Sequence, residues 1–321
     1  MKTHIIKLIF SSLLFSSCLK EELPVAIHKT GDVTRSEVNM EASYKWQIYF
    51  DLKTNTVAGQ NLKTAWDLGF ESGSDGHHII LNSAKTMFAY NTGQNLFTQV
   101  IDTAGYAVNR RWDAPSGSYD STAIGDWQIL NTVYIVDRGY DEMGNFLGFR
   151  KIQILDVDDE KYTVRFAHLN GDGDTHLQIM KDDNYNLSFL SFTTGATLQI
   201  EPPKDQWDLV FTQYTHVFYD PLQTYLVTGC LHNRYNTSVA VDSIMPFESI
   251  AFDKIQHYNF SNNINTIGYN WKTFEANYYT TKSNLNYIIR DSEGYYYKLH
   301  FIDFYNESGV KGNPTWEFQK L

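Results

Sequence analysis

The chain contains two segments that echo each other, and this internal repeat constrains the fold more than any other feature. Residues 49–70 (YFDLKTNTVAGQNLKTAWDLGF) and 189–211 (FLSFTTGATLQIEPPKDQWDLVF) each combine a strand, a turn and a Trp-Asp-Leu strand. The two Trp residues, Trp66 and Trp207, are separated by roughly 140 residues, a period expected for a duplicated module rather than for short repeats. The sequence therefore predicts two copies of one unit.

Later landmarks follow in the same order in both copies. Trp127 closes a short Ile-Gly segment in the first copy, and Trp271 closes a similar segment in the second. A Tyr-Ile strand comes next in each, beginning at Tyr134 and at Tyr287. We expect the repeated Trp side chains to be buried, since a large aromatic kept in register is normally part of a core. The predicted copies are residues 44–186 and 187–321.

The composition indicates strands. The chain has 22 Tyr, 20 Phe and 7 Trp, and many of them follow the alternation that is typical of β-strands. Helical periodicity is hard to find, so the predicted fold is all-β, with two tandem β-rich repeats forming antiparallel sheets and little helix. Asp67 and Asp208 each follow a repeated Trp. We expect both to be structural, accepting backbone N–H groups at a strand end.

The N-terminal residues have the pattern of a bacterial lipoprotein signal. Lys2 and Lys7 precede a short apolar stretch, and Ser16-Ser17 then lead into Cys18. The apolar stretch is too short to span a bilayer. We predict a signal peptide at 1–17, a lipid-modified Cys18 and a flexible tether over 18–43. A plain secretory signal with an incidental Cys is the alternative.

Charge and cysteine content exclude several classes. The net charge of −11 becomes more negative once Lys2 and Lys7 are removed, so the surface repels nucleic acid. Cys230 is the one other cysteine, and we expect a buried, inert thiol. The Asn-Gly-Asp-Gly-Asp run at 170–174 lacks the later ligands of a calcium loop and is read as a turn. No signature motif of an enzyme is present.

Several of these segments together resemble the HmuY-like haem-binding lipoproteins. The shared features are the Trp-Asp-Leu-x-Phe strand, the Tyr-Ile-Ile-Arg-Asp-x-x-Gly hairpin and the C-terminal stretches KLHFIDFYN (298–306) and KGNPTWEF (311–318). The resemblance is strongest over 187–321 and reaches the first copy through WDLGFESGSDGHHIILNS (66–83).

The resemblance implies a lipid-anchored protein on the surface of the outer membrane. Such a protein would take haem from host haemoproteins and pass it to a TonB-dependent outer-membrane receptor. In the family the iron is held by two His or two Met side chains. Here the segment matching one ligand position, residues 280–284 (TTKSN), contains neither residue type, so that ligand cannot be carried over.

Other side chains could hold haem iron, which takes imidazole, thioether, thiolate or phenolate ligands. His216 follows the second Trp-Asp-Leu strand, and His77-His78 follow the first at a similar spacing. Met245 and His257 lie where the order of segments in the family places its other ligand. We take Met245, His257 and His216 as the candidate haem ligands. The alternative is a lipoprotein of the same fold that binds a glycan or a peptide instead.

Overall fold

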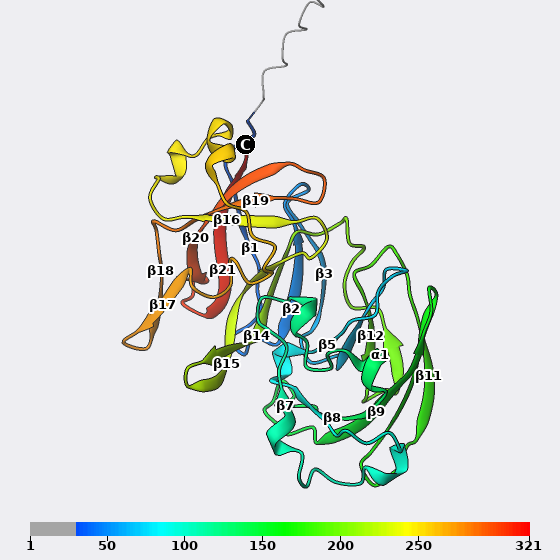
Figure 1. Ribbon diagram of the computed structural model, residues 1–321. Helices are drawn as coiled ribbons and strands as arrows, with labels where there is room; N and C mark the ends of the chain where they lie inside the picture. Colours follow the sequence, from blue (N-terminus) through cyan, green and yellow to red (C-terminus); the bar gives the residue numbers. More distant parts are fainter. Residues whose placement is uncertain (1–29) are drawn as a thin grey trace, which may run out of the picture.

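The computed structural model describes residues 30–321, and the predicted signal peptide, Cys18 and the first part of the tether lie outside this range. The described chain folds into two β-rich lobes, as Figure 1 shows. Strands dominate both of them, which confirms the predicted all-β fold. No helix among residues 30–321 is long and apolar enough to cross a membrane.

The first lobe, lobe A, is formed by residues 63–198. Its larger sheet has the strand order β11-β10-β9-β8-β6-β7 and its smaller sheet the order β13-β12-β4-β5. All of the pairings are antiparallel. The strands are β4 Leu68–Glu71, β5 Ile79–Leu81, β6 Phe88–Asn91, β7 Arg110–Arg111, β8 Val133–Asp137, β9 Phe149–Val157, β10 Lys161–Ala167, β11 Thr175–Met180, β12 Leu187–Ser191 and β13 Ala196–Leu198.

The second lobe, lobe B, combines residues 30–62 with residues 199–321. One sheet has the order β1-β21-β20-β19-β16 and the other the order β15-β14-β2-β3. A separate hairpin is formed by β17 and β18. The strands are β1 Thr34–Glu37, β2 Trp46–Asp51, β3 Thr56–Leu62, β14 Leu209–Tyr219, β15 Leu222–His232, β16 Ser238–Asp242, β17 Lys272–Glu275, β18 Tyr278–Thr281, β19 Asn286–Arg290, β20 Tyr296–Tyr305 and β21 Lys311–Lys320.

Short helices fill the connections. The described part of the chain has a single one-turn α-helix, α1 Trp127–Leu130, and six short 3₁₀ turns. These turns are η1 Ser83–Lys85, η2 Phe97–Gln99, η3 Ala107–Asn109, η4 Tyr119–Ser121, η5 Phe247–Ser249 and η6 Phe252–His257.

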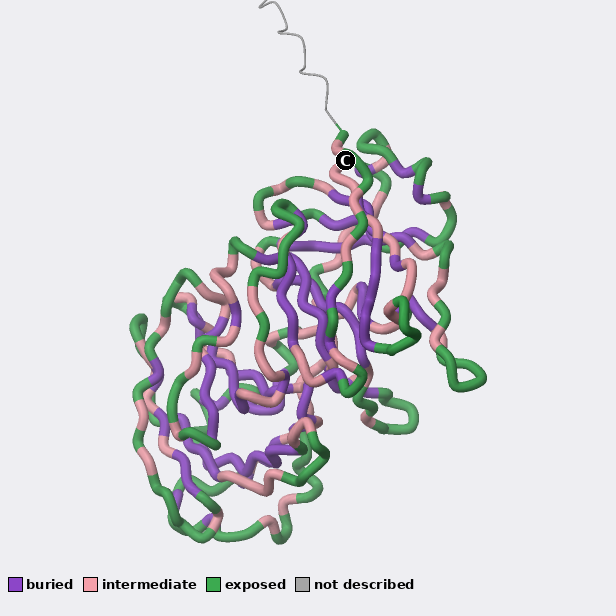
Figure 2. The backbone as a smooth tube through the Cα atoms, turned by 180° about the vertical axis from the view of Figure 1, so that it is seen from behind, coloured by how far each residue is buried: buried purple, intermediate pink, exposed green. Residues whose placement is uncertain are grey.

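The core of each lobe lies between its two sheets, where Figure 2 shows the buried backbone concentrated. In lobe A, Leu68 and Phe70 of the small sheet pack with Tyr134 and Ile152 of the large one. In lobe B, aromatic residues dominate, and Phe211 stacks on Trp316 with ring centroids 4.7 Å apart. Burying such rings is the main source of stability for a fold of this kind.

The repeated Trp residues are buried as predicted. Trp66, Trp207, Trp127 and Trp271 are all at most 7% exposed. Trp66 meets Phe189, and Trp207 meets Tyr49, in both cases edge-on with centroids 4.9 Å apart. The two contacts are equivalent in the two copies.

The hairpin that opens each copy pairs with the Trp-Asp-Leu strand of the other copy. Strand β2 pairs with β14, and strand β12 pairs with β4. The hairpins 46–62 and 187–198 therefore lie in the opposite lobe from the Trp-Asp-Leu strand that follows each in sequence. The lobes and the sequence repeats are thus not the same segments, and the chain crosses between lobes twice.

Candidate functional site

His216 is the predicted haem ligand that lies beside an exposed aromatic ring, Phe218. It lies on β14 opposite Tyr225 of β15 and is half-buried. The edge of its ring meets Phe218 at 4.7 Å and Tyr269 at 5.2 Å between centroids. Its Nδ1 atom is buried without a hydrogen-bond partner, and burial lowers the pKa of the ring. The neutral imidazole, the form that binds iron, is therefore favoured.

The end of the β14–β15 hairpin exposes an unusual amount of apolar surface. We call residues 216–226 the hairpin tip. Exposed hydrophobic patches of this kind are typical of surfaces that bind a ligand or a partner. The large exposed side chains of the hairpin tip are Phe218, Tyr219, Leu222, Tyr225 and Leu226.

The side chain of Met245 packs against the core of lobe B. It is half-buried in a cluster with Ile255 and Tyr258, and its Sδ atom lies 3.8 Å from the Tyr258 hydroxyl. That hydroxyl donates to Asp242 at 2.6 Å. The thioether would have to leave this cluster to reach an iron ion at the surface.

His257 is exposed at the end of η6, next to Tyr258 in sequence. In Figure 1 the segment 243–260 (yellow) lies at the top of lobe B, whereas the hairpin of β14 and β15 extends from its lower end. The structure therefore brings Met245 and His257 into one segment but does not bring His216 to them. The roles of all three as haem ligands stay predictions.

A cleft runs along the other face of the same hairpin, and we call it the hairpin cleft. Its volume is about 760 Å³, within the range of small-molecule sites. Val217 and Tyr219 line it, so His216 and Phe218, which alternate with them along the strand, lie on the opposite face. Lobe A contributes charged and aromatic side chains that include Arg110, Arg111 and Trp112. Among residues 30–321, no His, Met or Cys lines this cleft.

A second cavity lies between the lobes, lined by Trp66 and Trp207. Its volume is about 110 Å³, well below that of a ligand pocket. Burial raises the pKa of two carboxyls in its wall, Asp113 to about 6 and Glu201 to about 7. The cavity is a packing defect at the interface between the lobes and is too small for haem.

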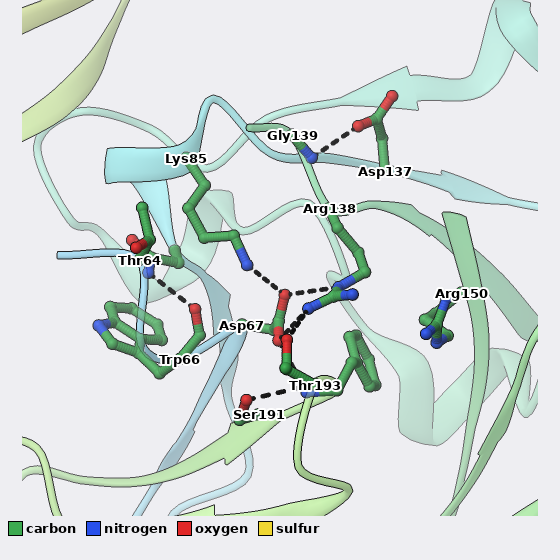
Figure 3. A network of polar contacts seen from close by, with 12 residues as sticks. Thr64, Trp66, Asp67, Lys85, Asp137, Arg138, Gly139, Arg150, Ser191 and Thr193 are labelled. Atoms are coloured by element: carbon green, nitrogen blue, oxygen red, sulfur yellow. Dashed lines mark hydrogen bonds and ion pairs between the residues drawn. The ribbon is translucent and has the colours of Figure 1, made fainter. Parts of the chain in front are cut away.

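Asp67 and Asp208 accept backbone N–H groups at strand ends, as predicted. The Oδ2 atom of Asp67 accepts from the N–H of Phe192 at 2.7 Å. Figure 3 shows that Asp67 also accepts hydrogen bonds from the ammonium of Lys85 and the guanidinium of Arg138. The Nε atom of Arg138 lies 3.0 Å from Oδ1 of Asp67. All three charged groups are buried, so the network stabilises lobe A and is not open to a ligand.

Two other sequence interpretations are confirmed. Cys230 is fully buried, and burial raises the pKa of its thiol, so the sulfur is unreactive. The run at 170–174 is the turn between β10 and β11. One of its acids, Asp174, pairs with Arg165 at 2.6 Å, so that carboxylate is engaged with an arginine.

Comparison with known proteins identifies the family. No curated protein matches the sequence. Among solved structures, apo PinO from Porphyromonas gingivitis is 10% identical, with a TM-score of 0.35 over 90% of this chain and 97% of that one. The Tannerella forsythia apo HmuY analog is 8% identical, with a TM-score of 0.32 over 91% and 98% of the two chains. The family model described as HmuY protein matches residues 43–318. Because this match spans most of the sequence, the chain belongs to the HmuY family.

Proposed function

We propose that this protein binds haem on the face of the hairpin tip that carries His216 and Phe218, with His216 as the protein ligand to the iron. The observation that carries the proposal is the half-buried imidazole of His216 beside a surface of exposed aromatic rings. Its Nδ1 atom is buried, so Nε2 is the ring nitrogen that would bind the iron. Membership of the HmuY family supports haem as the ligand class. A binding protein rather than an enzyme is the corresponding class of function.

The surroundings of His216 suit a flat, apolar macrocycle. Phe218 is exposed on the same face of the strand, and Tyr269 flanks the ring from a separate loop. Haem would cover these side chains and remove apolar area from water, which stabilises the complex. The structure brings neither Met245 nor His257 to His216, so we expect one imidazole ligand from this chain rather than two.

Location and delivery complete the proposal. Lipid attachment at Cys18 would anchor the chain to the outer membrane. Strand β1 makes the last part of the predicted tether a member of lobe B, so only the part before residue 30 would link the lobes to the anchor. From the cell surface, haem taken from host haemoproteins would pass to a TonB-dependent receptor. The exposed hairpin tip suits such a transfer because it leaves one side of the ligand open to a partner.

A haemin titration of the purified chain tests the proposal. A saturable Soret band with one haemin per chain is expected. Competition with a haemoprotein from which haem can be withdrawn then tests capture. A linear, non-saturating spectrum would show adsorption only and would contradict haem as the ligand.

The hairpin cleft favours a second candidate function, the binding of a glycan or a peptide. Its lining offers a Trp ring and two exposed arginines and contains no haem-ligating His, Met or Cys. Aromatic rings and polar groups of this kind recognise sugars and acidic peptides. A glycan array probed with wild type and with Trp112→Ala tests it: binding that depends on Trp112, without saturable haemin binding, would favour this candidate.

A further inference from the structure

A cluster of metal-binding side chains lies in lobe A, in a different sheet from the hairpin tip. Glu71 ends β4, and His77 and His78 precede β5. Each side chain offers one ligand atom, and these atoms all lie within 4.8 Å of one another. We propose that Glu71, His77 and His78 bind a divalent transition-metal ion such as Zn²⁺, independently of haem.

The turn between the two strands holds the carboxylate beneath the imidazoles. The N–H of Glu71 donates to the carbonyl of His78 at 3.0 Å, which closes the turn. In return, the Oε2 atom of Glu71 accepts the backbone N–H groups of His77 and His78 at 3.1 and 3.3 Å. It also lies 2.6 Å from Nδ1 of His78. The carboxylate is thus fixed by the backbone that carries the two His residues.

The ring of one histidine and the backbone of the other are held by neighbours outside the cluster. The ring of His78 stacks on Tyr119, with centroids 4.8 Å apart and planes 8° from parallel. The indole N–H of Trp127 donates to the carbonyl of His77 at 2.8 Å. Contacts of this kind orient metal ligands before the ion arrives, and their loss typically weakens metal affinity.

The donor set matches borderline metal ions. Two imidazoles with one carboxylate hold zinc in sites that keep a fourth position open, and imidazole suits Zn²⁺, Cu²⁺ and Ni²⁺ generally. Bond lengths of about 2.0–2.2 Å place two ligand atoms on one zinc ion at most roughly 4 Å apart. Side-chain movements of about an ångström would therefore gather the three ligands.

The cluster is accessible to an ion, and its surroundings favour a cation. The side chains of His78 and Glu71 are 26% and 25% exposed. The nearby ammonium of Lys181 donates to the carbonyl of Ser74 at 2.9 Å. Four carboxylates act electrostatically on this one ammonium, so the local charge is negative. They belong to Asp159, Asp158, Glu71 and Asp75.

The same geometry excludes haem held between these two histidines as a pair of axial ligands. The ring centroids of His77 and His78 are 4.0 Å apart, which leaves no room for a porphyrin between two axial ligands. The second copy has Thr212 in the sequence position of Glu71, so the site belongs to one copy only.

Calorimetric titration with zinc chloride tests the site on the full-length chain in detergent, after metal has been removed with a chelator. One zinc ion per chain is expected. Glu71→Gln and His78→Ala should each weaken binding more than about 100-fold, because losing a residue outside the coordination sphere already costs roughly 10- to 100-fold. Zinc should also raise the unfolding temperature of wild type but not of these variants.

Two histidine variants serve as controls. His176 is an exposed residue of β11, and His176→Ala should bind zinc as wild type does. His216→Ala should also retain zinc binding, which separates this site from the proposed haem ligand. Unfolding without zinc checks that Glu71→Gln and His78→Ala are folded, and His77→Ala replaces either one that is not. Wild-type zinc affinity in the cluster variants, or no saturable binding by wild type, would overturn the proposal.

Discussion

Asp67 and Asp208 make the same hydrogen bond in the two lobes. The Oδ2 atom of Asp67 accepts the N–H of Phe192 at 2.7 Å, and that of Asp208 accepts the N–H of Leu52 at 2.8 Å. In both cases the donor follows the first strand of the hairpin that enters from the other copy. The two carboxylates therefore secure the strand exchange that joins the lobes.

The charges around the two carboxylates differ. Asp67 is paired with the buried Lys85 and Arg138. No ion pair of Asp208 is found in residues 30–321; instead, burial, with a contribution from Asp291, raises its pKa to about 7. The duplicated aspartate is thus an ion-pair partner in lobe A and an unpaired carboxyl with a pKa near 7 in lobe B.

Replacing each aspartate by asparagine should separate these two roles. Asp67→Asn leaves Lys85 and Arg138 as uncompensated buried charges, which should lower the free energy of unfolding by about 3–5 kcal/mol. Asp208→Asn keeps an oxygen for the Leu52 N–H and removes a carboxyl near Asp291, so its effect at pH 7 should stay within about 1 kcal/mol. Urea unfolding measures both. Equal losses in the two variants would contradict the contrast between the lobes.

The stability of the fold should pass through a minimum near pH 7. Asp208 has a folded pKa of about 7 against an ordinary value of 3.8, so the folded state binds more protons and stability falls as the pH rises from about 4 to 7. Burial lowers the pKa of Lys272 to about 7 from 10.5, so stability should rise again as the pH increases from 7 towards 10.5.

Two variants test which residues cause the fall in stability as the pH rises towards 7 (the acid limb) and the rise in stability above pH 7 (the basic limb). Asp208→Asn should reduce the acid limb, to which Glu201 and Asp113 also contribute through their raised pKa values. Lys272→Met should reduce the basic limb, to which Lys63 also contributes because burial lowers its pKa to about 8. Each limb should amount to a few kcal/mol, since one pKa unit corresponds to about 1.4 kcal/mol. An acid limb of the same size in wild type and in Asp208→Asn would show that Asp208 ionises normally in the folded protein.

The two faces of the β14–β15 hairpin should respond differently to haemin. Phe218→Ser removes an exposed ring beside His216 and should lower haemin affinity about fivefold to tenfold. Without the ring, haemin would bury less apolar area, and the binding free energy would weaken by about 1 kcal/mol. Tyr219→Ser removes an exposed ring on the cleft face and is the matched control. A larger loss in Tyr219→Ser would place haem in the hairpin cleft instead.

The proposed lipid anchoring depends on one residue, Cys18. Cys18→Ala should release the protein from the membrane fraction, because the acyl chains that hold it would be absent. Labelled palmitate should enter wild type and not the variant. Failure of wild type to incorporate the label would leave a plain secretory signal as the interpretation.

Local sequence patterns were sufficient to predict the all-β fold, the buried Trp pairs and the structural role of Asp67 and Asp208. They could not predict that β12 pairs with β4 and β2 with β14, because both partners are equally suitable strands and only tertiary packing chooses between them. Nor could they predict that Asp208 lies near another carboxyl, Asp291, where Asp67 has two cations. Asp291 is far from Asp208 in sequence and only the fold brings them together.

The candidate site was less predictable. His216 follows a recognisable strand, but the strand's length and the exposed tip beyond it depend on pairing with β15. Met245 and His257 were grouped by the order of segments along the chain, which carries no distance information. The sequence alone does not single out Glu71 beside His77 and His78, because the six-residue separation becomes a contact only when the turn closes.

The most direct test of haem binding at the hairpin tip is a Soret titration of wild type, His216→Ala and His176→Ala in parallel. Wild type and His176→Ala should give the same saturable band with one haemin per chain. His216→Ala should give a shifted, broadened band and a large loss of affinity, because the iron loses its protein ligand. An unchanged band and affinity in His216→Ala would contradict the proposed site.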